Sequence, residues 1–295
     1  MSRFLAETLD LSRLPPFTLV TANYEAILAA RLSDLKARLL AGGIDYDVDQ
    51  LETDPLGILE QEDAFREFLE LQALNDAGRS LTLAYAVGAA LDHLAATLFA
   101  DIGLRRMDGE GDDRFRTRIA LAPEAKSAGT LGGYEYQALT ATLQVRDALA
   151  LNYSSGLVER GQIQLMIVPA LGADPDATIA AVRLAVLDRD VKLGTDDVRV
   201  LLATPAPYDV TATLFIARGP DPTLVRTDAL ARLAVYAEDR RRAGRIIAKS
   251  GLDAALHTPA VDRAERSVPA GDVDPGAAGV AVLRTATITV EVLDV

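Results

Sequence analysis

The alternation of strands and helices in this chain is clearest at residues 162–203, QIQLMIVPALGADPDATIAAVRLAVLDRDVKLGTDDVRVLLA. The apolar runs at 162–168 and 198–203 predict two strands, because each is short, rich in aliphatic residues and bounded by turn-forming residues. Between them, Asp174-Pro175 supplies a helix cap followed by Pro at the first helical position, which predicts a helix to Asp190. With a further strand expected at 148–152, this region is predicted to be β-β-α-β.

A second series of the same kind follows towards the C-terminus. Its helix again begins at an Asp-Pro pair, Asp221-Pro222, and is expected to run to about residue 242. Strands are expected at 208–216, 261–266 and 280–292, and a short helix at 252–257. The order is β-α-β-β, so both series predict small α+β units, similar to split βαβ motifs, in which helices cover one face of a sheet.

The first third of the chain shows helical periodicity instead. Leu28, Leu32, Leu35 and Leu39 follow at i, i+4, i+7 and i+11, and Gly42-Gly43 provides a helix stop. Asp54-Pro55 predicts the start of a second amphipathic helix, which carries Ile58, Phe65, Phe68 and Leu69 on one side. Further helices are expected from about Ser80 to Gly103, at 115–121 and at 131–143.

These patterns together predict an α+β protein. A mainly helical N-terminal domain with a Pro-containing arm is expected at 1–125, a middle α+β domain at 126–204 and a C-terminal α+β domain at 205–295.

Composition excludes several classes of function. The 295 residues contain no Cys and two His, which excludes disulfides, thiol nucleophiles and Cys-ligated metals. The formal net charge of −13 disfavours nucleic acid as a partner, since binding to phosphates depends on basic residues. No apolar stretch predicts a membrane span, and the first 17 residues lack the pattern of an export signal.

Motifs for catalysis or cofactor binding fail in detail. Asp45, Asp47 and Asp49 begin like a calcium loop, but Gln50 and Leu56 stand where Gly and Glu are required. Gly109-Glu110-Gly111 lies in an acidic run, 108–113, which predicts an exposed loop and not a phosphate site. His93 and His257 lie in no known catalytic pattern, and their expected role is structural. We therefore expect no catalytic residue, no cofactor and no metal.

Interaction surfaces are the remaining candidates for function. The leucine stripe and the aromatic stripe fit two hypotheses, the core of the domain itself or packing against helices of other subunits. A cluster of arginines near residue 240 is either a solvated helix end or a docking patch for an acidic neighbour. The candidate interface residues are Leu28, Leu32, Leu35, Leu39, Phe65, Phe68, Leu69, Arg240, Arg241 and Arg242.

Several short motifs in fixed order resemble the baseplate J-like family of contractile phage tails and related injection systems. They are Leu14-Pro15-Pro16, Glu52-Thr53-Asp54-Pro55, Phe65-Arg66-Glu67, Asn75-Asp76-Ala77, the run from Ala84 to Ala95, Arg114-Phe115-Arg116-Thr117-Arg118-Ile119, Ser127-Ala128-Gly129, Tyr134 and Ala138-Leu139. The matches concentrate in 14–145, and the order of later elements, including Gly219-Pro220-Asp221 before a helix, agrees to the C-terminus. Departures from the family pattern are Thr53, Ala90 and His93.

The resemblance implies a structural wedge subunit without catalytic residues or cofactor. Such subunits assemble with other wedge proteins and with copies of themselves into a sixfold ring around the hub and spike, next to sheath and fibre proteins. The implied location is the baseplate of a virion or tail particle, assembled in the cytoplasm of the bacterial host. Two alternatives stay open, a structural adaptor unrelated to phages and a metal-dependent enzyme that uses the acidic segment 45–54.

Overall fold

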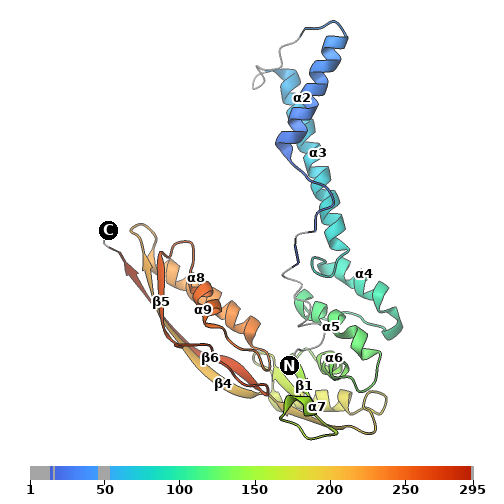
Figure 1. Cartoon of the computed structure of the whole chain (residues 1–295), viewed down its shortest axis with the longest axis vertical. Helices are drawn as coiled ribbons and strands as arrows, with labels where there is room; N and C mark the ends of the chain where they lie inside the picture. The colour runs from blue at the N-terminus through green and yellow to red at the C-terminus, as the bar shows by residue number, and fades with distance from the viewer. Residues whose placement is uncertain (1–13, 16, 46–53, 294–295) are drawn as a thin grey trace. The chain divides into compact units, whose positions relative to one another are not determined.

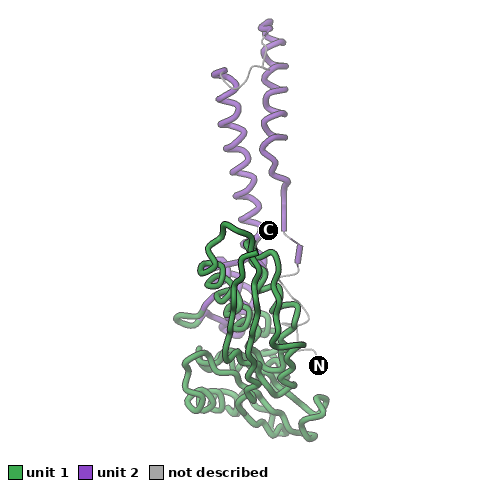
Figure 2. Tube along the Cα trace, turned by 90° about the vertical axis from the view of Figure 1, so that its left-hand side faces the viewer, with its two compact units in different colours: residues 1–8, 107–110, 117–295 green, residues 9–106, 111–116 purple. Residues whose placement is uncertain are grey.

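The computed structural model describes residues 14–15, 17–45 and 54–293. These residues form two compact units (Figure 2): a helical unit of the described residues up to 106 together with 111–116, and a mixed unit of 107–110 and 117–293. The α-helices are α2 (Tyr24–Ala41), α3 (Pro55–Ser80), α4 (Gly88–Leu98), α5 (Asp112–Ala125), α6 (Leu131–Ala141), α7 (Pro175–Val186), α8 (Pro222–Arg240) and α9 (Lys249–Leu256). The strands are β1 (Val145–Leu151), β2 (Gln162–Pro169), β3 (Asp197–Leu202), β4 (Thr204–Ile216), β5 (Arg263–Val268) and β6 (Gly279–Val292).

The helical unit is built from α2, α3, α4 and the start of α5. Side-chain caps begin the two long helices: Asn23 accepts a hydrogen bond from the Ala26 amide, and Asp54 accepts one from the Leu56 amide. A small apolar core lies near α4, where Leu91, Ala95 and Phe115 are buried. The unit therefore combines a small closed core with a long pair of helices that buries little.

The first sheet of the mixed unit has the strand order β1-β2-β3. β1 and β2 are antiparallel, whereas β2 and β3 are parallel neighbours joined by α7. Asp174 caps α7 by accepting hydrogen bonds from the amides of Asp176 and Ala177. Ile179, Val182 and Val186 are buried on α7, and the spacing of these residues follows the helical period that the sequence predicts.

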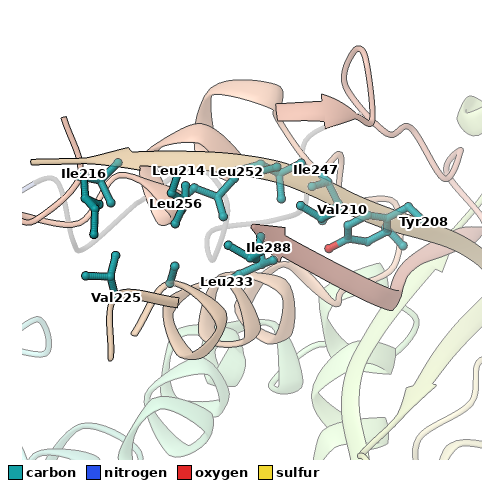
Figure 3. Close-up of a cluster of buried hydrophobic side chains, with 14 residues drawn as sticks. Tyr208, Val210, Leu214, Ile216, Val225, Leu233, Ile247, Leu252, Leu256 and Ile288 are labelled. Carbon is teal, nitrogen blue, oxygen red and sulfur yellow. The ribbon is translucent and has the colours of Figure 1, made fainter. Parts of the chain in front are cut away.

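The second sheet has the strand order β5-β4-β6, and α8 and α9 cover one of its faces (Figure 1). β4 is parallel to β6 over the whole length of β4, with a bulge after Tyr208, and antiparallel to β5. Alternate residues of β4 enter the core, and Figure 3 shows Val210 and Leu214 of β4 in the same cluster as Leu233 of α8. In both sheets the two parallel strands are direct neighbours, whereas in the expected split βαβ unit another strand lies between them.

The two sheets are connected through one residue, Ala203, which lies between β3 and β4. The amide of Ala203 donates to the Ile167 carbonyl of the first sheet (2.9 Å), and the amide of Thr204 donates to the Ala278 carbonyl next to the second (3.0 Å). A buried cluster fills this junction, with Leu151, Val158, Met166, Val168, Ala203, Ala243 and Val280. All of β2 from Leu165 to Val168 is buried, because the side chains of Met166 and Val168 enter this cluster.

The predicted α+β class is confirmed: a helical N-terminal region precedes the strand-containing units. One helix start was wrong. The segment expected to begin at about Ser80 instead ends α3 there, and α4 begins at Gly88, because the chain turns at 81–87. Hydrogen bonds to the Thr82 carbonyl from the amides of Tyr85 and Ala86 hold this turn.

Candidate interaction surfaces

The leucine stripe of α2 lies on a helix without a buried residue. Leu28, Leu32, Leu35 and Leu39 are each half-buried on the helix that contacts α3. Packing between two helices alone leaves such side chains partly in water, since one neighbour covers only part of each leucine. The leucine stripe therefore leaves part of its apolar surface exposed to water in the helical unit.

The aromatic stripe lies on α3 and is more exposed. Ile58, Phe65 and Leu69 are 50%, 52% and 46% exposed, and their spacing of i, i+7 and i+11 places them on one side of the helix. Phe68 is half-buried and stacks on Phe65, with 6.4 Å between ring centroids. Tyr24 of α2 meets the edge of Phe65 at 6.5 Å. Ile58, Phe65 and Leu69 thus expose apolar side chains on one side of α3, with Glu62, which pairs with Arg66, between the first two.

An ion cluster joins α2 to α3 on another side of the α3 helix. The Arg31 guanidinium contacts carboxylates of Glu60 (2.8 Å), Asp63 (2.9 Å) and Glu67 (3.4 Å), which recur at helical spacing along α3. Arg31 of α2 thus pairs with three carboxylates of α3, and these ion pairs determine which face of α3 meets α2. This register leaves Ile58 and Leu69 facing outward, while Tyr24 of α2 covers part of Phe65.

The arm before α2 is held on α3 by Asn75. The buried Asn75 side chain accepts hydrogen bonds from the amides of Leu19 (2.8 Å) and Val20 (3.0 Å) and donates to the Val20 carbonyl (2.9 Å). Gly78 lies under the arm, where a Cβ atom would come within 2.6 Å of the Leu19 side chain. The motif Asn75-Asp76-Ala77 gave no indication of this role, because its partners lie 55 residues away.

Arg79 and Tyr85 extend the same attachment. Arg79 donates to the Phe17 carbonyl (3.0 Å), and the Tyr85 hydroxyl donates to the Pro15 carbonyl (3.2 Å). Both contacts use backbone oxygens of the arm, so they depend on its path and little on its side chains.

The arginine cluster lies at the end of α8, close to the junction of the two sheets. Arg241 donates to the Pro169 carbonyl (2.7 Å) and pairs with Glu238 (2.7 Å), and its side chain is only 11% exposed. Arg242 pairs with Asp239, and Arg240 lies over the Tyr236 ring. Burial opposes ionisation of Glu238, but the Arg241 hydrogen bonds and the charge of Arg146 outweigh it and lower the pKa of Glu238.

Most of the acidic run at 108–113 is exposed, as the sequence predicts, but Asp112 begins α5 and Glu110 differs from the prediction. Glu110 is buried, accepts a hydrogen bond from the Met107 amide and pairs with buried Arg118 at 2.6 Å. The prediction was wrong here because composition cannot show that a cation eight residues later turns back onto this carboxylate.

Other candidate chemistry has little structural support. Within the described residues, no group of three or more His, Asp or Glu side chains is arranged to hold a metal ion. His93 and His257 are both exposed. Of the acidic trio in the failed calcium motif, Asp45 is exposed, whereas Asp47 and Asp49 lie outside the described residues. No helix among the described residues is long and apolar enough to cross a bilayer.

Comparison with known proteins connects these surfaces to a family. Residues 52–102, which include all of α3 and α4, match the model of the baseplate J-like N-terminal domain. Residues 208–289, which include α8, α9 and most of the second sheet, match the baseplate J-like protein C-terminal domain. The chain is also 32% identical to baseplate protein J of Escherichia phage P2 over 287 residues, covering 90% of this chain and 92% of that protein.

Proposed function

The chain belongs to the baseplate J-like family, and from that premise we propose that it is a structural component of the baseplate of a contractile phage-type tail. In this role it is a non-catalytic wedge subunit. It assembles with other wedge proteins and further copies of itself into a sixfold ring around the hub and spike. Its working location is the tail particle, which is assembled in the cytoplasm of the host, and changes in the ring pass through it to the sheath.

The observation that carries this proposal is the similarity to a phage baseplate protein along almost the full length of both chains. The helical unit supports it physically. Its two long helices bury little by themselves, while Ile58, Phe65 and Leu69 form an outward apolar stripe. A stripe of this kind suits helix packing with a second subunit, which removes its apolar area from water.

We assign the main contact with other wedge proteins to the two stripes on α2 and α3, with Phe65, Phe68 and Leu69 at its centre. Aromatic side chains are strong anchors in protein interfaces because each buries a large, rigid apolar surface. Arg240 and Arg242 form a second, polar contact of this proposal, since their side chains are 36% and 33% exposed. Arg241 supports that contact from within, through its bond to Pro169.

The test is co-expression with the proteins encoded beside this chain, followed by size exclusion with mass determination and negative-stain imaging. We expect a hetero-complex that builds sixfold rings. A chain that binds none of its encoded neighbours contradicts the proposal.

A point variant locates the contact. Leu69→Asp places a charge in the exposed stripe and outside the Arg31 cluster, so we expect a folded chain that fails to join the complex. Leu184→Asp on α7 is the matched control, because Leu184 is 82% exposed and lies outside both stripes. If Leu69→Asp assembles as well as Leu184→Asp, the stripe is not the interface.

A further inference from the structure

The two edges of the second sheet differ in length and in charge. β5 has six residues and carries Arg263, Glu265 and Arg266, so it is a short, charged edge of the kind that resists pairing with other strands. β6 has fourteen residues, and Arg284 and Glu291 are its charged side chains. Between them lies Thr285-Ala286-Thr287-Ile288-Thr289-Val290, which is dominated by β-branched residues.

Among the residues that the structure describes, few pair with the outer side of β6. Within the described part of the chain, pairing on that side consists of one bridge, between Ala243 and Val280. From Ala281 to Val292, β4 is the one described strand that pairs with β6, so alternate backbone amides and carbonyls on the other side face away from the sheet. A long edge with few charges is a template for addition of a further strand.

The arrangement of side chains on β6 selects the partner. Thr285, Thr287, Thr289 and Glu291 are exposed, whereas Ile288 is buried and Ala286 and Val290 are partly buried against the core cluster. Arg284 lies on the exposed face next to Thr285, where both bind Asp209. One face of the strand thus carries a cation at its start and an anion near its end.

We infer that β6 pairs with β6 of a second copy of this chain, antiparallel, about a twofold axis at Ile288. An axis through a residue keeps each face of the sheet in register with itself, as strand pleating requires. Thr287 then lies opposite the partner's Thr289, and Ala286 lies opposite the partner's Val290. Threonine pairs and aliphatic pairs of this kind are favourable across antiparallel strands.

Charge decides the direction of pairing. The antiparallel arrangement sets Thr285 opposite the partner's Glu291 and Arg284 diagonally next to it, and this happens twice because of the twofold axis. A parallel, in-register pair would instead set Arg284 against Arg284 and Glu291 against Glu291, which is unfavourable. A second copy in the antiparallel direction therefore pairs the open backbone and places Glu291 near Arg284, which also pairs with Asp209 of its own chain.

This self-pairing rests on the proposed function for its place in a baseplate, because it supplies a contact between copies. It is tested on the isolated full chain by sedimentation over a wide concentration series. We expect a reversible dimer whose dissociation constant rises at least roughly tenfold in Thr287→Lys, since the lysines disrupt the paired threonines. Ser267→Lys on the β5 edge is the matched control and should leave the dimer unchanged.

Introduced cysteines test the register, since the natural chain has none. Mixing Thr287→Cys with Thr289→Cys chains should give a disulfide-linked heterodimer faster than either variant alone. A wild-type chain that stays monomeric overturns the inference, as does a dimer that tolerates Thr287→Lys in chains with unchanged thermal unfolding. Loss of binding to another baseplate protein in Thr287→Lys, without a wild-type dimer, assigns the edge to a different partner. A failed dimer with intact ring assembly leaves the proposed function standing.

Discussion

Asn75→Ala should release the N-terminal arm from α3 without unfolding the helix. The substitution removes three hydrogen bonds, of 2.8, 3.0 and 2.9 Å, to the backbone of Leu19 and Val20. A hydrogen bond in a protein contributes about 0.5–1.5 kcal/mol net, and the arm is partly exposed, so water replaces some of the loss. We expect the free energy that holds the arm to fall by about 2–3 kcal/mol, because Ala retains helix propensity but no polar group.

Amide hydrogen exchange measures this release directly. The amides of Leu19 and Val20 should exchange roughly 30- to 150-fold faster in Asn75→Ala, since each 1.4 kcal/mol is a factor of ten. Amides in α8 of the mixed unit serve as the internal reference. Asn75→Asp is the matched control, because its carboxylate still accepts from both amides while losing the donor to the Val20 carbonyl, and it should show an intermediate rate. Unchanged exchange at Leu19 and Val20 in Asn75→Ala would refute the reasoning.

Three further predictions concern the mixed unit. Leu233→Ala, at a fully buried position on α8, should lower the free energy of unfolding of this unit by about 3–4 kcal/mol in chemical denaturation, and a loss below that of an exposed leucine control such as Leu224→Ala contradicts the packing. Glu110→Leu should lower the free energy of unfolding by about 3–5 kcal/mol, because Arg118 is then buried without its carboxylate. Adding Arg118→Met should recover most of this loss. Equal stability of the single and double variants argues against a buried pair. Hydrogen bonds from Arg284 and Thr285 lower the pKa of Asp209 to about 2, so its stabilising effect should be present above pH 4 and be lost as the pH falls towards 2. Thermal unfolding of Asp209→Asn against pH should lack this dependence, and an identical profile for both proteins means that the pairing does not contribute.

Local sequence chemistry predicts much of the fold. The Asp-Pro pairs at 174–175 and 221–222 each begin a helix as expected, because the carboxylate cap and the fixed φ of Pro act within two or three residues. The alternation of buried and exposed residues in β4 is likewise a property of the strand itself. These features depend on neighbours in sequence, and periodicity detects them.

Contacts distant in sequence were not predictable in this way. Asn75 bonds the arm 55 residues earlier, and Arg241 bonds Pro169, 72 residues earlier. A periodic pattern places the candidate stripe of Phe65 and Leu69 on one side of a helix, but it gives no account of Arg31, whose three ion pairs determine the side that faces α2. The open edge of β6 also follows from strand order, which composition leaves undetermined.

The single residue between β3 and β4 has a mechanical consequence. Because Ala203 alone separates the strands and both flanking amides are hydrogen-bonded, there is no slack in the backbone between the two sheets. Tension applied along β4 passes directly to β3 through the backbone, because there is no longer linker between them that would straighten first. Separating β3 from β4 under load would require breaking the hydrogen bonds between β2 and β3 or those between β4 and β6. The two sheets therefore respond to a pull as one stiff element, with the load borne by hydrogen bonds that must break together.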